Sequence, residues 1–319
     1  MQTGIFVSEA WGQGSTVDEV RERARQAEAL GYPSAWVPYL PWAIDSMAAM
    51  QAAGEATQHI EIGSAVIPTY FFHPLAMARQ AITAQAAIGR PIHLGIGCSN
   101  PAVIEMHGMA FERPARHVRE YLQILEKAFE AGSQPSGSVE TVGFVEYQGE
   151  MFNLASIYGS PLAQPIGSTL VGALGPHMLR ATGACSDGVI ATWSDERVIE
   201  HMIAPPVISA AADVGRSSPR IAAVVATAIV SGKQVDKVRE AAQAMFGIYE
   251  QTMPYQRMID ASASGKVSGI CVIGDEEEVA RRLRGYREAG LTEFIAAPLS
   301  VEGATWQATA ERLAAIDVA

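Results

Sequence analysis

A short apolar run followed by an amphipathic helix recurs along the chain, and this repeat constrains the fold more than any other feature. In the first unit, the apolar run Gly4 to Val7 precedes a helical stretch, Val17 to Leu30, whose apolar positions keep a period near 3.6 residues. Thr16 and Glu19 predict a capping box at its start, and Gly31 is placed as a C-terminal glycine. The unit is therefore one strand and one helix.

Seven further units follow the same pattern. Their expected strands are 34–38, 60–67, 92–97, 168–173, 188–192, 220–230 and 293–297. Their helices are expected at 45–57, from 74, at 115–131, from 176, from 195, from 234 and at 305–316. Alternating strands and helices indicate a parallel sheet, and eight repeats without a linker-like break favour closure into a barrel. We predict an α/β fold, a (β/α)8 TIM barrel with insertions, in a single domain covering 1–319.

Two segments interrupt the repeat. Residues 132–167 are rich in Gly, Ser and Pro and contain β-like pieces at Val142 to Tyr147 and Glu150 to Asn153, which predict an inserted hairpin over one end of the core. Residues 253–291 hold an irregular stretch and a charged helix, Asp275 to Ala289, ahead of the eighth strand. Because active sites of such barrels lie at the carboxyl ends of the strands, we expect the loops after the strands to carry the site.

Charge and cysteine content limit the partners. Lys and Arg number 23 against 34 Asp and Glu, a net charge of −11, and no basic run occurs, which argues against nucleic acid or an anionic membrane. No segment reaches the roughly 18 apolar residues that span a bilayer, and the N-terminal residues lack a signal-peptide pattern, so we expect a cytoplasmic protein. Cys98, Cys185 and Cys271 show no CxxC spacing, so neither a metal site nor a disulfide framework is expected.

The turn after the fourth strand holds candidate binding residues. Gly95 and Gly97 allow the backbone to approach a ligand closely, and the Ser99 hydroxyl and the Asn100 amide can hydrogen-bond it. The spacing is not GxGxxG, and the next helix is expected only near 115, so a dinucleotide fingerprint is not predicted. An ordinary glycine turn between strand and helix is the alternative interpretation.

The turn after the fifth strand runs directly into an expected helix. It contains Ala173, Leu174, Gly175, Pro176 and His177, with the helix beginning at the proline. Free N–H groups at a helix N-terminus behind a glycine turn form a good anion site, so a phosphate is a candidate ligand here. A plain connection is again the alternative.

No sequence pattern of a serine hydrolase, zinc protease or P-loop occurs. The candidate catalytic residues are therefore those that stand at the ends of the expected strands. His73 stands at a strand end, and His177 opens a helix at the proposed phosphate turn. Tyr39, Trp42 and Trp193 also follow strands, where they can form walls for a flat aromatic ligand. Filling of the core is the alternative interpretation of each aromatic residue.

Six segments spread over nearly the whole chain occur in a characteristic order: GSAVIPTYFFHPLAMARQ, GRPIHLGIGCSN, RPARHVREYLQIL, VEYQGEMFNL, LVGALGPHMLRATGACSDGVI and VIGDEEEVARRLRGYREAGLTEFI. With this ordered series the chain resembles the luciferase-like monooxygenase superfamily, and most closely its branch of oxidoreductases that use the deazaflavin coenzyme F420. The resemblance implies a (β/α)8 barrel with insertions, which agrees with the independent count of units, and a homodimer.

The resemblance also implies a cofactor and the residues that hold it. The cofactor would be coenzyme F420, with FMN as the alternative. A non-proline cis peptide at Ala65–Val66 would back its central ring, Gly97, Cys98, Ser99 and Asn100 would line the ring and ribityl chain, and the turn 173–177 would hold its phosphate. Because F420 carries a phosphodiester and an acidic glutamyl tail, helix N-termini and a few local arginines would have to bind it in this negatively charged protein.

The sequence departs from one group of that branch. Sugar-phosphate dehydrogenases carry an Asp-His pair after the second strand and a Glu after the fourth, where this chain has Tyr39-Leu40 and Asn100. Alcohol oxidation then lacks its general base, so the resemblance favours hydride transfer from the reduced deazaflavin to an activated C=C, C=N or carbonyl substrate. Tyr39, His73 and Asn100 are the candidate catalytic residues, Tyr39 or His73 as proton donor, and Trp42 and Trp193 the candidate substrate pocket.

Two other functions stay open at the level of the sequence. One is an FMN-dependent monooxygenase of the same fold, which uses reduced flavin supplied by another protein together with molecular oxygen. The other is a protein that binds a flavin-like ligand without turnover, which the loss of the Asp-His pair would permit. Binding of F420 or of FMN is the observation that separates the F420-dependent oxidoreductase from the FMN-dependent monooxygenase.

Overall fold

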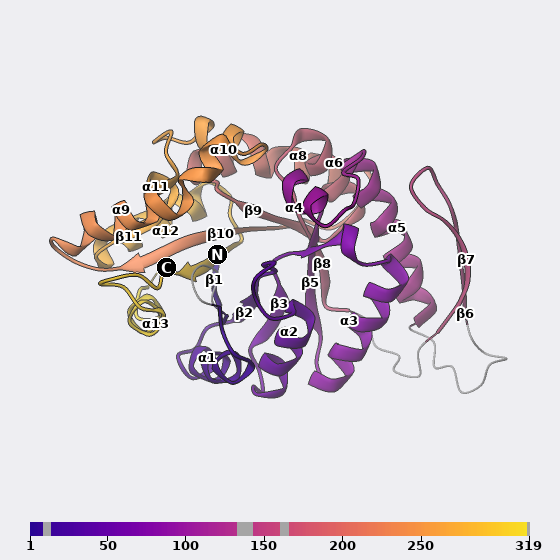
Figure 1. The fold of residues 1–319 in the computed structure, drawn as a ribbon, viewed down its shortest axis with the longest axis horizontal. Helices are drawn as coiled ribbons and strands as arrows, with labels where there is room; N and C mark the ends of the chain where they lie inside the picture. The colour runs from indigo at the N-terminus through magenta and orange to yellow at the C-terminus, as the bar shows by residue number, and fades with distance from the viewer. Residues whose placement is uncertain (9–13, 133–142, 160–165, 318–319) are drawn as a thin grey trace.

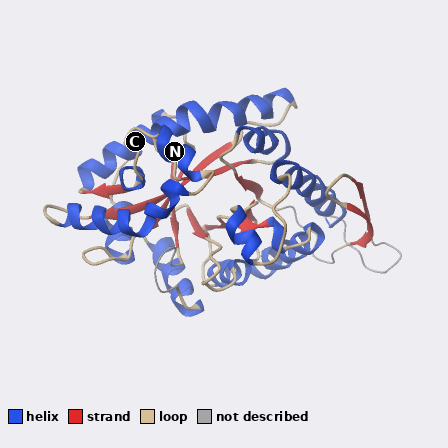
Figure 2. Ribbon diagram, turned by 45° about the horizontal axis from the view of Figure 1, so that its top comes forward, coloured by secondary structure: helices blue, strands red, loops and turns tan. Residues whose placement is uncertain are grey.

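Eight parallel strands close into a barrel in the computed structural model, which describes residues 1–8, 14–132, 143–159 and 166–317 (Figures 1 and 2). The strands, in their order around the ring, are β1 (Gln2–Phe6), β2 (Ser34–Val37), β3 (Glu61–Ser64), β5 (Ile92–Gly97), β8 (Ser168–Gly172), β9 (Gly188–Thr192), β10 (Arg220–Ile229) and β12 (Glu293–Pro298). β12 pairs with both β10 and β1, which closes the ring. The predicted (β/α)8 fold is confirmed.

Helices follow every barrel strand and surround the ring. The longer ones are α1 (Val17–Ala29), α2 (Ser46–Glu55), α3 (Pro74–Ile88), α5 (Pro114–Gly132), α6 (Pro176–Cys185), α8 (Ala204–Asp213), α9 (Gln234–Phe246), α12 (Glu276–Glu288) and α13 (Trp306–Ala314). The predicted capping box of α1 is present, because Thr16 Oγ1 accepts from Glu19 N and the Glu19 carboxylate accepts from Thr16 N. Gly31 follows with the left-handed φ of +83° that favours glycine.

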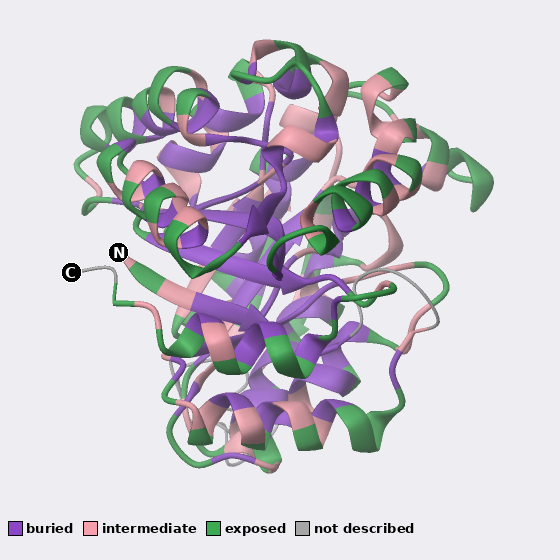
Figure 3. Cartoon of the chain, turned by 90° about the vertical axis from the view of Figure 1, so that its left-hand side faces the viewer, coloured by how far each residue is buried: buried purple, intermediate pink, exposed green. Residues whose placement is uncertain are grey.

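Apolar side chains fill both faces of the barrel strands. Figure 3 shows the strands as a buried layer with exposed residues on the outer faces of the helices. Inside the ring, Phe6, Trp36, Leu170 and Ile190 belong to one buried cluster. β10 is buried along nearly its whole length, as expected of a parallel strand covered on both faces. Among the described residues, the interior of the ring is thus filled by side chains.

Two elements near the site differ from the sequence-based expectation. A short helix, α4 (Pro101–Met106), begins directly after β5, where the first helix was expected only near 115. Asn100 caps it and Pro101 occupies its first turn, which together are a helix start signal. The helix was not predicted because its six residues show no clear apolar period. The expected strand 60–67 is also split, since β3 ends at Ser64 and β4 (Ile67–Pro68) pairs separately with β5. A 3-10 turn, η1 (Thr69–Phe71), follows.

The first insertion forms the predicted hairpin, with a shifted second strand. β6 (Gly143–Gln148) pairs antiparallel with β7 (Asn153–Tyr158), and both lie against α5 at the side of the barrel rather than over its end (Figure 1). The segment expected to be a strand, 150–153, is mostly the turn, because the Glu120 carboxylate of α5 accepts the N–H groups of residues 150, 151 and 152. The expectations for 133–142 and 160–165 lie outside the described residues.

The second insertion contains a strand that the sequence did not reveal. It follows α9 as η4 (Gly247–Gln251), α10 (Tyr255–Ala261), α11 (Val267–Ile270), β11 (Val272–Gly274) and then α12, the predicted charged helix, which Asp275 caps. β11 runs parallel to the end of β10, with Thr227 opposite Val272 and Ile229 opposite Gly274. The pairing of β11 with β10 joins the insertion to the sheet.

After β9 lie two short helical segments, α7 (Glu196–Val198) and the π-helical η3 (Ile199–Ile203).

Candidate cofactor and active site

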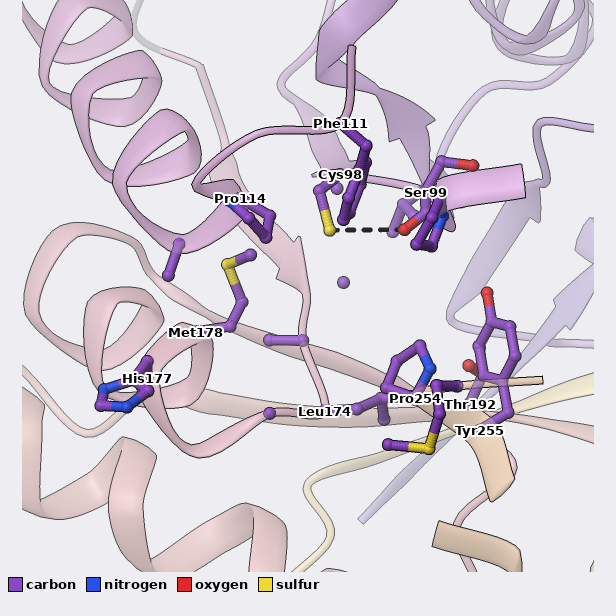
Figure 4. A pocket seen from close by; sticks show the side chains of 18 of the residues that line it. Cys98, Ser99, Phe111, Pro114, Leu174, His177, Met178, Thr192, Pro254 and Tyr255 are labelled. Atoms are coloured by element: carbon purple, nitrogen blue, oxygen red, sulfur yellow. Dashed lines mark hydrogen bonds between the residues drawn. The ribbon is translucent and has the colours of Figure 1, made fainter. Parts of the chain in front are cut away.

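A cleft of about 790 Å³ opens at the carboxyl ends of the strands, which is the size of many small-molecule sites (Figure 4). The turns after β5 and β8, the start of α5 and the insertion at 253–255 form its walls. Ten of the eleven residues predicted to bind the cofactor line it: Ala65, Val66, Gly97, Cys98, Ser99, Ala173, Leu174, Gly175, Pro176 and His177. The eleventh, Asn100, lines an adjoining pocket.

The Ala65–Val66 peptide bond is cis, as the family resemblance implied. The preceding residue is fixed to the next strand, since Ser64 Oγ donates to the Gly95 carbonyl and accepts from the Gly95 N–H, each at 2.9 Å. A Cβ atom added at Gly97 or at Gly172 would lie 3.0 Å from Val66 Cγ2. Glycine at the ends of β5 and β8 therefore makes room for the Val66 side chain in the floor of the cleft.

The turn after β5 presents an apolar thiol and a hydroxyl to the cleft. Figure 4 shows Cys98 and Ser99 on one wall, with Leu174, Pro254 and Tyr255 opposite. Burial raises the pKa of Cys98 to about 11, so the side chain is a neutral thiol at pH 7. Ser99 has a φ of +61°, an uncommon backbone conformation for a residue other than glycine, which turns this segment toward α4.

The start of α6 forms an uncapped helix N-terminus facing the cleft. Gly175 occupies the N-cap position, and no side chain of the described residues caps the helix. A Cβ atom added at Gly175 would meet nothing within 4 Å, so the turn borders open space. The N–H groups of His177 and Met178 lie in the first turn, where helices lack internal acceptors. The geometry fits a phosphate, as predicted for this turn.

Charged side chains gather at the mouth of the cleft. The Glu150 carboxylate, from the hairpin turn, lies 2.6 Å from Arg113 and 2.7 Å from Arg116 at the start of α5. The His177 ring nitrogen Nδ1 accepts a hydrogen bond of 3.0 Å from Arg180. Sequence reasoning noted the arginine-rich stretch only as part of the family resemblance, because its position at the cleft depends on how α5 packs.

A second, aromatic pocket of about 240 Å³ adjoins the cleft and shares Ala65, Val66, Ser99, Thr192 and Tyr255 with it. The predicted residues Tyr39, Asn100, Trp42 and Trp193 line this pocket. Tyr39 packs at 5.8 Å from Phe71 and Trp193 at 4.8 Å from Tyr249, between ring centroids. Burial, with the Asp45 charge, raises the pKa of Tyr39, so its hydroxyl keeps its proton at neutral pH.

Tyr255 lines both cavities and was missed by sequence reasoning. Burial raises its pKa to about 12, so its hydroxyl keeps its proton at neutral pH. The residue follows Met253 and Pro254 in the irregular part of the second insertion, where no period indicates which way a side chain points. An aromatic residue beside a proline at a barrel mouth is the only signal that the sequence offers.

His73, a predicted proton donor, lines neither cavity, so the structure does not bring it together with the other predicted site residues. Its side chain caps α3, with Nδ1 accepting from the Leu75 N–H at 3.3 Å. Its ring is exposed and meets Phe152 edge-on at 6.2 Å between centroids. Helix capping therefore explains the presence of His73 before Pro74. The same ring nitrogen that accepts the capping hydrogen bond had suggested a role in proton transfer. Asn100 also caps a helix, α4, yet borders the aromatic pocket as well.

Two features are absent from the described part of the chain. None of its helices is both long and apolar enough to cross a membrane. It also holds no group of three or more His, Cys, Asp or Glu side chains placed to bind a metal ion.

A closed parallel barrel with a cofactor-sized cleft at the carboxyl ends of its strands defines the class of protein, a (β/α)8 barrel with a small-molecule site. The particular family follows from its sequence profile. Residues 1–293 match the luciferase-like monooxygenase family, and the chain belongs to it. The resemblance read from the six segments is confirmed.

Individual relatives are distant but cover most of the chain. A 5,10-methylenetetrahydromethanopterin reductase of Archaeoglobus fulgidus is 25% identical over 312 residues, which cover 87% of this chain and 89% of that protein. The coenzyme F420-dependent tetrahydromethanopterin reductase of Methanopyrus kandleri superposes with a TM-score of 0.76 at 19% identity, covering 99% and 97% of the two chains. The oxygenating constituent of 3,6-diketocamphane monooxygenase of Pseudomonas putida, in complex with FMN, has a TM-score of 0.72 at 16% identity, covering 99% and 97%.

Proposed function

We propose that this protein is a coenzyme F420-dependent oxidoreductase that transfers a hydride from the reduced deazaflavin to a small organic substrate. One observation carries the proposal: a single cleft joins an apolar floor at Ala65–Val66 to the uncapped N-terminus of α6. A flat ring system linked to a phosphate has that distribution of apolar and anionic groups. The relatives that are F420-dependent enzymes support the same cofactor.

The residues of the cleft suit each part of such a cofactor. Ala65, Val66 and Cys98 offer apolar surface to the ring, and Ser99 with Asn100 offers hydrogen bonds to a hydroxylated chain. The N–H groups behind Gly175 bind the phosphate. When bound, the deazaflavin supplies a hydride carrier, and the protein contributes position, exclusion of water and protons.

The aromatic pocket binds the substrate beside the cofactor. Trp42 and Trp193 provide flat apolar walls, which favour an unsaturated or aromatic substrate. Its described lining contains no histidine or carboxylate, so a general base for alcohol oxidation is missing. Tyr39 donates the proton that accompanies the hydride, and Asn100 orients the polar atom of the substrate. Reduction of a C=C, C=N or carbonyl group is the reaction that this lining supports.

The quaternary and cellular setting belongs to the same proposal. The chain acts as a single domain, assembles as a homodimer and works in the cytoplasm. Pairing of β1 with β12 joins the two ends of the repeat into one sheet, which supports a single folding unit. Light scattering of the purified protein tests the dimer directly.

An FMN-dependent monooxygenase is the second candidate. It is favoured by the FMN complex of the Pseudomonas putida enzyme, which has the same fold. The start of α6 suits the phosphate of FMN as well as that of F420. The cofactor itself must therefore be tested.

A fluorescence titration with oxidised F420, and a second with FMN, tests the proposal. We expect micromolar affinity for F420 and an affinity for FMN that is weaker by about tenfold or more. Tight binding of FMN without binding of F420 would show that the protein is a flavin enzyme and would overturn the proposal. Inhibition of F420 binding by excess FMN is the control that both occupy one cleft.

A further inference from the structure

The cofactor cleft and the aromatic pocket adjoin, and five described residues line both cavities. They are Ala65, Val66, Ser99, Thr192 and Tyr255, and we call this boundary the junction. A hydride passes only between atoms in contact, about 3 to 3.5 Å apart in a reactive arrangement. With the cofactor ring in the cleft and the substrate in the pocket, the carbon that accepts the hydride therefore lies at the junction.

The side chains of the junction are of two kinds. Ala65 and Val66 are apolar, whereas Ser99, Thr192 and Tyr255 carry hydroxyl groups that each donate one hydrogen bond. A phenol is a stronger acid, and so a better donor, than the alcohols of serine and threonine. Figure 4 shows the ring of Tyr255 reaching from its wall toward Ser99, which carries the hydroxyl away from the backbone. Tyr255 is therefore the strongest of the three donors.

A series of aromatic rings supports Tyr255 from behind. Its ring meets that of Tyr249 edge-on, at 5.1 Å between centroids and an angle of 89°. Tyr249 lies 4.8 Å from Trp193, and Trp193 lies 4.9 Å from Phe246, which is fully buried. Since this contact series runs into the core, the hydroxyl is held in place before a substrate arrives. A donor fixed in advance stabilises developing charge without the cost of reorganisation.

A hydrogen-bond donor at the junction favours one kind of hydride acceptor. When a hydride adds to the carbon of an aldehyde or ketone, the electron pair of the C=O π bond moves to the oxygen on that same carbon. The oxygen then takes a proton, and the product is an alcohol. In an activated C=C group the oxygen that gains charge lies farther along the molecule, away from the junction. In a cationic C=N group the hydride cancels a positive charge, which a hydroxyl donor does not assist.

We propose that Tyr255 is a catalytic residue whose hydroxyl donates a hydrogen bond to the oxygen of an aldehyde or ketone while the hydride adds to the carbon that bears it. The inference rests on the proposed function, because it needs the reduced deazaflavin in the cleft, and it narrows the substrate to a carbonyl compound. Tyr39 supplies the proton to the same oxygen. The flat walls formed by Trp42 and Trp193 favour an aromatic carbonyl compound.

A binding measurement without cofactor tests the hydrogen bond. The probe is p-dimethylaminobenzaldehyde, whose absorption moves to longer wavelength when its carbonyl oxygen accepts a hydrogen bond. We expect such a shift with the wild-type protein and a smaller one with Tyr255→Phe, which keeps the ring and removes the hydroxyl. Tyr158→Phe is the matched control and should keep the full shift, because the Tyr158 hydroxyl is buried in the hairpin without a hydrogen-bond partner among the described residues.

Steady-state kinetics with reduced F420 test the catalytic role. With benzaldehyde, Tyr255→Phe should lower kcat by about tenfold or more and leave KM within about threefold of the wild type, because the hydrogen bond strengthens in the transition state. With N-methylquinolinium, a flat cation with a C=N acceptor, the substitution should leave kcat within about twofold. The affinity for oxidised F420 should stay unchanged in both variants.

The outcomes separate this inference from the proposed function. No spectral shift with the wild-type protein, an equal shift in Tyr255→Phe, or an equal loss of kcat with both substrates would overturn the role of Tyr255. Faster reduction of methyl cinnamate, a C=C acceptor, than of benzaldehyde by the wild-type protein would overturn the substrate class, and this comparison needs no variant. Binding of F420 without reduction of benzaldehyde would overturn the inference and leave the cofactor in place. Failure of F420 to bind would overturn the proposed function, and this inference with it.

Discussion

Gly175 is the residue at which folding and binding make different demands. Its φ of −81° is accessible to any amino acid, and a side chain there would meet no neighbouring atom. Nothing in the fold therefore requires glycine at this N-cap position. The demand comes from the ligand, because a side chain would occupy the space in front of the helix N-terminus.

We predict that Gly175→Asp weakens F420 binding by about tenfold or more, about 1.4 kcal/mol, because its carboxylate repels the phosphate. The same change should leave the free energy of unfolding unchanged or raise it by about 0.5 kcal/mol, since Asp is a good N-cap. Fluorescence titration and urea denaturation measure the two effects. Gly175→Asn caps equally well without charge, and an equal loss of affinity in both variants would contradict an anion site.

Position along the repeat was enough to find most of the cleft, because the ends of parallel strands meet at one rim. The turns after β5 and β8 were identified this way, whereas Ala65 and Val66 were identified through the family resemblance. The sequence could not show that His73 caps α3, because a polar residue before a proline serves equally as a helix cap or as a ligand. Tyr255 was missed because an irregular insertion has no period from which to read the direction of a side chain.

At the level of elements, β3 and β5 approach each other closely at Gly95. A Cβ atom on this residue would collide with the backbone carbonyl oxygen of Ser64, which cannot rotate away as a side chain can. The Ser64 hydroxyl is also fixed to the Gly95 backbone from both sides. Gly95 thus sets the spacing of the strands just before the cis peptide bond.

Gly95→Ala should therefore lower the free energy of unfolding by about 2 kcal/mol or more, because the strands must move apart to admit the methyl group. Urea denaturation followed by circular dichroism measures the loss. Gly247→Ala is the matched control: φ there is −54°, and the nearest atom to the new methyl group is 3.5 Å away, so its stability should stay within about 0.5 kcal/mol of the wild type. Equal stability of both variants would show that the strands adapt freely.

Long elements were predictable because their period is repeated many times, whereas short ones were not. α4 has six residues and β11 has three, too few for an apolar pattern to emerge. β11 exists because the end of β10 extends beyond its barrel neighbours and offers a free edge. Such an edge depends on the stagger of all the strands in the sheet. A short stretch of sequence carries no information about that stagger.

At the scale of the whole molecule, an ionic network joins distant strands at the amino-terminal end of the barrel. Arg220 of β10 lies 2.7 Å from Glu293 of β12 and 3.1 Å from Glu61 of β3. Glu61 in turn lies 3.0 Å from His93 of β5. Glu293 is fully buried and also accepts hydrogen bonds from Ser34 and Trp36. Residues from across the chain thus meet opposite the cleft.

This network predicts a loss of stability in acid. The hydrogen bond from His93 and the nearby charges of His93 and Arg220 lower the pKa of Glu61 to about 2, against burial, which raises it. Since the folded pKa lies below the ordinary value of 4.5, Glu61 stabilises the fold above pH 4.5, and this contribution disappears as the pH falls from 4.5 toward 2. Urea denaturation at a series of pH values measures it.

Glu61→Gln should be less stable than the wild type near neutral pH and should show a shallower decline across that acid range. Glu288→Gln, which replaces an exposed carboxylate on α12, is the control and should follow the wild-type curve. Parallel curves for wild type and Glu61→Gln would show that Glu61 does not contribute through its charge.

The pairing of β11 with β10 has a consequence for how such a protein diversifies. The segment that carries Tyr249, Met253 and Tyr255 to the mouth of the barrel is held at both ends, by α9 and by a strand that belongs to the sheet. Its backbone is fixed by these two elements, so the side chains that it carries can be exchanged without a change in backbone conformation. New substrate preferences can therefore arise in this lineage by single replacements in this segment, while the cofactor turns after β5 and β8 stay unchanged.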